Sequence, residues 1–258
     1  MPPQTPTPNL LSDLQAYYTS IPPITRFLTT ATLLTSLLPA FGLVHPTRLL
    51  FIPSKILAFE LWRTLTPFFW MPLGFSFLMH LYFLGQNSAD LERGFFGGRR
   101  ADFLVFLGFS AVVINIAAYF LELYSLVDPL LLALIYVWST ANGSRPVSFL
   151  FGIQFQAMYL PYVLVAMDVL QGNVFPIPKL LGIAVGWVYW YLEKVVPERG
   201  GRRVLVAPRV LDEYVGEGEG RRAEGYVAIP PQRRPGVQPS VTENMRHRWG
   251  TGRRLGTG

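Results

Sequence analysis

The 258-residue sequence contains no cysteine, only three histidines and few charged residues. Without cysteine the chain can form neither a disulfide nor a thiolate-ligated zinc or iron–sulfur centre. Charged residues make up 15% of the chain and hydrophobic residues 51%, which is more apolar than a typical soluble domain. The composition therefore predicts a membrane protein, and we expect no metal ion and no cofactor.

The basic residues are concentrated towards the C-terminus. Of the 22 lysines and arginines, 13 fall at or after Lys194, where the arginines form pairs separated by glycine, proline and glutamate. This arrangement differs from the basic stripe of a nucleic-acid-binding surface, so we expect no nucleic-acid partner. Because a segment so rich in glycine, proline and arginine cannot bury a core, residues 199–258 are predicted to form a disordered tail.

Six apolar runs predict membrane-spanning helices. They are Ile24–Val44, Phe68–Leu84, Ala101–Leu121, Leu126–Ser139, Phe149–Leu170 and Leu180–Val196. The fourth and sixth runs are shorter than the roughly 20 residues that cross a bilayer, which suits helices shielded by protein or a locally thinned membrane. The predicted fold is an all-α membrane protein with a six-helix domain over residues 21–198. Residues 1–20 form a short N-terminal segment without the features of a cleaved signal peptide.

The first loop, Val44–Thr66, mixes apolar and charged side chains too closely to span a membrane. Leu49-Leu50-Phe51-Ile52 is followed within a few residues by Lys55 and Glu60. This pattern fits an interfacial helix lying among lipid headgroups. It fits equally an amphipathic helix packed on the helical body, and the pattern alone does not separate the two.

The distribution of basic residues predicts which side of the membrane each loop occupies. Six spans put both termini on one side, together with these arginines: Arg93, Arg99, Arg100, Arg145, Arg199, Arg202 and Arg203. The other side has its main basic content in the first loop: His45, Arg48, Lys55 and Arg63. Its two short turns hold Glu122 with Asp128, and Asp168 with Lys179. The positive-inside rule therefore predicts that both termini lie in the cytosol.

A few polar residues fall inside the predicted spans and are candidates to line a cavity or a lateral opening: His80, Asn115, Gln154 and Gln156. Asn115 and the two glutamines are more typical of hydrogen bonds between helices. His80 could serve as a general base for Ser76, which lies one helical turn earlier. An active intramembrane serine protease is therefore one alternative.

Small residues and prolines predict how the helices pack. Gly182 and Gly186 form a Gly-x-x-x-Gly pattern, which lets a neighbouring helix approach closely. Pro72 near the second span and Pro161 in the fifth predict kinks. Two kinked spans could border an opening towards lipid.

Several segments carry specific motifs: LWRTLTPFF at Leu61–Phe69, PLGFSFL at Pro72–Leu78, LERGFFGGRRADF at Leu91–Phe103, YVWS at Tyr136–Ser139, FQAMYLPY at Phe155–Tyr162 and LGIAVG at Leu181–Gly186. Together they resemble the Derlin family, the proteolytically inactive rhomboid relatives of the endoplasmic reticulum membrane. The resemblance implies a six-transmembrane-helix rhomboid-like fold with an interfacial first loop, in which Trp62 and Arg63 resemble a membrane-interface anchor. One departure is Trp187, where many Derlins have histidine.

The sequence lacks the catalytic residues of the rhomboid proteases that this fold resembles. Those enzymes use the serine of a Gly-x-Ser-Gly motif and a histidine three residues before the Gly-x-x-x-Gly of the sixth span. No Gly-x-Ser-Gly occurs in this chain, and Lys179 stands where the histidine would be. We therefore expect no catalytic residue and no peptide hydrolysis by that mechanism.

The C-terminal residues Trp249–Gly256 resemble the SHP box, a short motif that binds the valosin-containing-protein type AAA ATPase. Trp249 and Leu255 would fill apolar pockets, the glycines would permit close approach, and the arginines would make ionic contacts. The residues expected to bind the ATPase are Trp249, Gly250, Gly252, Arg253, Arg254, Leu255 and Gly256.

The Derlin resemblance implies a component of endoplasmic-reticulum-associated degradation. Such a protein aids the retrotranslocation of misfolded lumenal or membrane proteins, with its tail recruiting the ATPase. The implied partners are a membrane RING ubiquitin ligase complex, misfolded substrates and the lipid bilayer, within a homo- or hetero-oligomer. A non-enzymatic membrane scaffold or trafficking factor is a further alternative.

Overall fold

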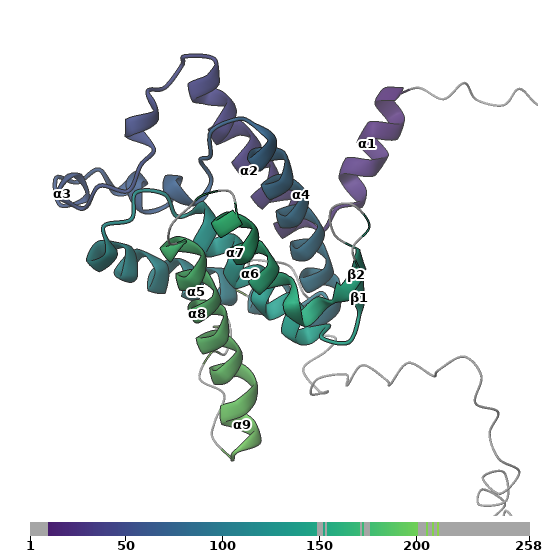
Figure 1. The fold of residues 1–258 in the computed structure, drawn as a ribbon. Helices are drawn as coiled ribbons and strands as arrows, with labels where there is room; N and C mark the ends of the chain where they lie inside the picture. Colours follow the sequence, from purple (N-terminus) through teal and green to yellow (C-terminus); the bar gives the residue numbers. More distant parts are fainter. Residues whose placement is uncertain are drawn as a thin grey trace, which may run out of the picture. The chain divides into compact units, whose positions relative to one another are not determined.

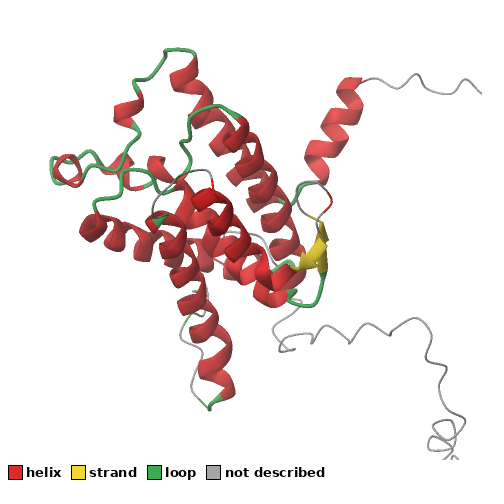
Figure 2. Ribbon diagram, in the orientation of Figure 1, coloured by secondary structure: helices red, strands yellow, loops and turns green. Residues whose placement is uncertain are grey.

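The computed structural model describes residues 10–148, 152, 154–170, 172, 176–200, 205, 208 and 211, all within one compact unit, Met1–Gly218. This part of the chain is mostly helical (Figures 1 and 2). Its α-helices are α1 (Leu10–Ser20), α2 (Pro23–Ala40), α3 (Pro53–Ile56), α4 (Phe75–Asp90), α5 (Arg100–Leu121), α6 (Val127–Ala141), α7 (Leu160–Leu170), α8 (Ile177–Trp190) and α9 (Val196–Glu198).

Shorter helical turns extend or connect these helices. The described residues include the 3₁₀ turns η1 (Pro46–Arg48), η2 (Leu61–Thr64), η3 (Thr66–Phe68) and η6 (Ala157–Tyr159). The π-helical turns η4 (Leu91–Phe95) and η7 (Tyr191–Val195) continue α4 and α8. The first loop is therefore built from α3 and several single turns, not from one continuous amphipathic helix.

Proline and backbone conformation set several helix ends. α2, α3 and α8 each have a proline in their first two positions. An N–H at these positions would have no acceptor within the helix, so proline, which lacks the N–H, costs nothing there. α5 stops at Glu122, which adopts a left-handed conformation with φ of 52°. α4 starts only at Phe75 because Pro67, Pro72 and Gly74 interrupt the preceding residues, so the second apolar run becomes helical later than predicted.

α5 is the described helix that is long and apolar enough to cross a membrane. Its 22 residues rise about 33 Å, which matches a hydrocarbon core of about 30 Å. Val127–Ala141 and Ala157–Leu170 are shorter apolar helices. The body of the protein is therefore a set of apolar helices of unequal length.

The prediction of one helix over Phe149–Leu170 was wrong in its first part. Gln154–Gln156 form strand β2, which pairs antiparallel with β1 (Pro146–Ser148). Val147 lies opposite Phe155 in the register. The cause is local, because Gln-Phe-Gln alternates polar and apolar residues with the period of a strand and exposes both glutamines. The helix α7 begins only at Leu160.

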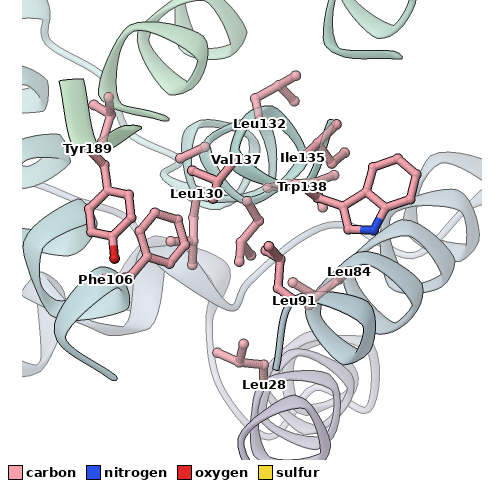
Figure 3. Packing of buried hydrophobic residues seen from close by; sticks show 14 of the residues in the cluster. Leu28, Leu84, Leu91, Phe106, Leu130, Leu132, Ile135, Val137, Trp138 and Tyr189 are labelled. Carbon is pink, nitrogen blue, oxygen red and sulfur yellow. The ribbon is translucent and has the colours of Figure 1, made fainter. Parts of the chain in front are cut away.

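The core is organised around α6. Most residues of α6 are buried, and α4, α5, α7 and α8 all contact it. In Figure 3, Phe106 and Tyr189 lie on one side of this helix, and Leu84 and Leu91 lie on another. Because its neighbours shield it, α6 can remain apolar at only 15 residues. The expectation that the short fourth run is a shielded central helix agrees with this burial.

Candidate functional site

The contact between α6 and α8 is the most extensive between two helices in the described part of the chain. Gly182 and Gly186 of α8 face α6 there. A Cβ atom added at Gly182 would lie 2.4 Å from the Pro129 carbonyl oxygen, and one at Gly186 would lie 2.9 Å from the Ala133 carbonyl oxygen. Both positions therefore need glycine for the two backbones to approach this closely.

A polar cluster lies near the N-terminal end of this contact. Lys179 of α8 forms an ion pair with Asp168 of α7, with 2.7 Å between Nζ and Oδ1, and both side chains are about four-fifths buried. Lys179 also lies within electrostatic range of His80 on α4 and Asp128 on α6. Four helices thus bring one histidine, two carboxylates and one lysine to the same end of the apolar body.

The polar cluster does not contain the catalytic groups of a serine protease. His80 is buried, and its Nδ1 has no hydrogen-bond partner. Ser76 is exposed, and in the described residues no serine is hydrogen-bonded to His80 or to Lys179. Lys179 is already paired with Asp168. Within the described residues, the cluster therefore holds no nucleophile activated by a base.

The four polar residues that the sequence offered as candidates for a cavity or a lateral opening lie in three different places. His80 lies in the polar cluster. Asn115 instead donates from Nδ2 to the carbonyl oxygens of Ala111 at 2.8 Å and Thr64 at 3.2 Å, which joins α5 to the first loop. Gln154 and Gln156 are exposed on β2. The sequence placed Asp128, Asp168 and Lys179 on one side of the membrane but offered no signal that joined them to His80.

Trp62 and Arg63 occupy different environments in the first loop. The Trp62 side chain is half-exposed, whereas Arg63 is buried. The Arg63 Nη1 atom donates to the carbonyl oxygens of Thr47 at 2.6 Å and Leu50 at 3.1 Å, and its Nε donates to Glu60. Arg63 therefore connects parts of the first loop from inside, and of these two residues only Trp62 has an exposed side chain.

The Arg63 guanidinium also affects the ionisation of Glu60. Its hydrogen bond holds the pKa of the Glu60 carboxyl below the ordinary value. A carboxyl with a lowered pKa in the folded state stabilises the fold at neutral pH, and this contribution is lost as the pH falls through the lowered pKa. Because Glu60 is partly exposed, solvent screens the pair and keeps the effect small.

Glu92 joins the start of α2 to the end of α4. Its Oε1 accepts from the Ile24 N–H at 3.2 Å, and its Oε2 accepts from the Thr25 N–H at 2.9 Å and the Thr25 hydroxyl at 2.8 Å. The two N–H donors belong to the N-terminus of α2, where N–H groups have no acceptor within the helix and a negative charge is also favoured. The buried carboxylate therefore caps a helix 67 residues away in sequence.

A second acidic residue connects α4 to the region around the β-hairpin. The Asp90 Oδ2 atom accepts from the indole N–H of Trp138 and from Arg145, each at 3.2 Å. Trp138 lies near the end of the buried part of α6, and Arg145 directly precedes β1. Sequence reasoning identified the LERGFFGGRRADF segment as a motif but did not assign these connecting roles to Asp90 and Glu92.

The predicted ATPase-binding residues, Trp249–Gly256, lie outside the described residues. Their assignment therefore stays a prediction from the sequence.

Comparison with known proteins covers almost the whole chain. Residues 21–209 match the Der1-like family. Derlin-1 of Homo sapiens is 36% identical over 253 residues, which are 95% of this chain and 99% of the human protein. Derlin-1 of Drosophila melanogaster is 34% identical over 250 residues, again 95% and 99% of the two chains. Derlin-1.2 of Zea mays is 32% identical over 229 residues, 87% of this chain and 92% of the maize protein.

The matched region includes the buried Glu92 cap, the polar cluster around Lys179 and the glycine contact between α6 and α8. With this coverage and identity, the chain belongs to the Der1-like family.

Proposed function

We propose that this chain is a multi-pass protein of the endoplasmic reticulum membrane that aids the retrotranslocation of misfolded proteins for degradation. The match of residues 21–209 to the Der1-like family carries this proposal. Substrates would be misfolded lumenal or membrane proteins. Its partners would include a membrane RING ubiquitin ligase complex, in a homo- or hetero-oligomer.

The proposed topology has six spans, formed by α2, α4, α5, α6, α7 and α8, with both termini in the cytosol. The ion pair between Lys179 and Asp168, and the nearby Asp128 and His80, support a shared side for the starts of α4, α6 and α8 and the end of α7. The arginine-rich loops lie at the opposite ends of these helices, which favours the cytosol there and the lumen at the polar cluster.

The proposed mechanism lowers the membrane barrier without breaking a covalent bond. α6 rises only about 22 Å over its 15 residues, less than a hydrocarbon core of about 30 Å. A bilayer that fits this helix must thin locally. The charged groups of Asp168 and Lys179 would then hold water near the lumenal end, where a polar substrate segment enters. The lateral opening would lie beside α4 and α7, which belong to the second and fifth predicted spans.

The proposal excludes serine protease activity and predicts no labelling by a serine-reactive fluorophosphonate. The purified chain should remain unlabelled, and it should leave transmembrane substrates uncut, because Ser76 is not bonded to His80. An active rhomboid protease labelled in parallel is the positive control. Labelling that disappears in a His80→Ala variant would instead assign the chain to the proteases.

The tail is proposed to recruit the ATPase through Trp249 and Leu255. In a pull-down of the purified valosin-containing-protein type ATPase, the double variant Trp249→Ala/Leu255→Ala should reduce capture more than about tenfold, because buried apolar anchors carry most of the affinity in such motifs. The matched control is Arg233→Ala/Arg234→Ala, which removes two tail residues outside the motif. Equal capture by the two double variants would remove the tail assignment.

A further inference from the structure

The outer side of the first loop forms an apolar groove against α5. The groove has a volume of about 360 Å³ and is lined mainly by Phe51, Ile56, Leu57, Ile116, Tyr119 and Phe120. This volume is near the lower end of the roughly 300–1,000 Å³ that small-molecule sites occupy. It therefore suits one flexible hydrocarbon chain better than a large rigid ligand.

The groove lies on a face with exposed apolar side chains. Four of its lining residues lie on α5, the described helix long and apolar enough to cross a membrane. Leu57 is 79% exposed and Phe120 76% exposed, so the rim is apolar as well as the floor. Phe59, next to this rim in sequence, is 85% exposed. Side chains of this kind are stable at a surface only where hydrocarbon or the membrane interface covers them.

Two basic residues lie close in sequence to the residues that line the groove. Lys55 is on α3 between Pro53 and Ile56, both of which line the groove, and Arg48 is on the preceding turn η1. Both side chains are exposed, and within the described residues neither forms an ion pair. Glu60 lies within electrostatic range of both, but its carboxylate is already bonded to Arg63.

We propose that this groove binds an anionic phospholipid of the leaflet in which the first loop lies. One acyl chain occupies the space between α3 and α5, and the phosphate contacts Lys55 and Arg48. The long side chains of lysine and arginine place their charge at headgroup level while their methylenes cover apolar surface. The charge complementarity selects an anionic headgroup over a zwitterionic one. This binding site is separate from the proposed degradation function and does not depend on it.

A second cavity provides an internal comparison. It has a volume of about 280 Å³ and lies between α2, η3 and α5, with Leu107 in a lining that is entirely apolar. Hydrocarbon can enter both cavities. Arg26 lies between Ile24 and Phe27 in the lining of the second cavity, but its guanidinium is half-buried and already donates to the carbonyl oxygens of Thr19 and Ile21. A headgroup preference is therefore expected at the groove and not at the second cavity.

The test is photo-crosslinking in vesicles. The full chain is reconstituted in phosphatidylcholine vesicles that contain a small fraction of either phosphatidylserine or phosphatidylcholine with the same diazirine-bearing acyl chain. We expect the phosphatidylserine probe to label peptides around Ile56 and Ile116 more strongly than the phosphatidylcholine probe. Arg48→Gln and Lys55→Gln should each reduce the phosphatidylserine labelling about fivefold and leave the phosphatidylcholine labelling unchanged.

Two tryptophan variants test the groove itself. Ile116→Trp fills the groove and should abolish labelling there by both probes, whereas Leu107→Trp fills the second cavity and should leave groove labelling intact. Equal labelling by the two probes would overturn the headgroup assignment. Labelling spread evenly along the exposed face of α5, including Val112, and unaffected by Ile116→Trp would identify ordinary surrounding lipid and overturn the site. Arg48, Lys55 and Ile116 are exposed and Leu107 is half-buried, and a melting curve of each variant confirms that it is folded.

Discussion

Replacing Gly182 by alanine is expected to destabilise the protein by about 3 kcal/mol, the upper end of the usual cost of overpacking a core. The new methyl group would lie 2.4 Å from the Pro129 carbonyl oxygen and 2.7 Å from the Leu132 Cβ atom. Neither atom is the mobile end of a flexible side chain, so α8 would have to move away from α6. Because the contact between α6 and α8 organises the core, this movement would also disturb the packing of neighbouring residues.

The matched control for Gly182 is Gly108→Ala. Gly108 lies within α5, and a Cβ atom there would meet nothing within 4 Å. Alanine favours a helix over glycine by up to about 1 kcal/mol, so this control should be neutral or stabilising. The measurement is the free energy of unfolding of the full chain in detergent. Equal stability of the two alanine variants would show that α6 and α8 are not packed as described.

Replacing Glu92 by alanine is expected to destabilise the protein by about 3 kcal/mol. The change removes the acceptor for two backbone N–H groups and the Thr25 hydroxyl, and each buried donor left without a partner costs about 1–3 kcal/mol. Water can reach part of the freed helix end, which keeps the total below the sum of three such costs. Glu92→Gln should lose about half as much, because it keeps the shape but loses the charge that favours a helix N-terminus.

The loss of the Glu92 cap should also be local and detectable. Arg26 lies in the first turn of α2, and trypsin cleavage after it should become faster when the helix start frays. Glu198→Ala is the control, because Glu198 is exposed and its side chain makes no hydrogen bond in the described residues. If Glu92→Ala matched Glu198→Ala in both stability and cleavage, the cap would have no energetic role.

Continuous apolar runs predicted helices correctly where apolar residues are not interrupted by an alternation with polar ones. The run Ala101–Leu121 became α5, and the run beginning at Ile24 became α2, since both need only local hydrophobicity and a proline or glycine to set their ends. The helix prediction for the fifth run was wrong because it depended on the average hydropathy of the run. That average does not reflect the alternation of Gln154, Phe155 and Gln156, which specifies a strand.

The polar connections could not be predicted because each joins residues distant in sequence. Glu92 caps a helix 67 residues earlier, and Asp90 accepts from Trp138, 48 residues later. A charged residue at the end of an apolar run looks the same whether it faces solvent or a helix terminus. Arg63 illustrates the point, since its position in the first loop suggested a lipid anchor, whereas the fold uses it inside the loop.

The most direct test of the proposed function is the decay of a misfolded membrane protein in cells that lack their own Derlin-1. Expression of this chain should restore rapid decay of the substrate, and Gly108→Ala should restore it equally. The variant Trp249→Ala/Leu255→Ala should still bind the substrate but should return decay to the rate without the chain, because the membrane body alone has no source of force. If the intact chain left decay unchanged while it bound the substrate, a scaffold role would replace retrotranslocation and the account would be contradicted.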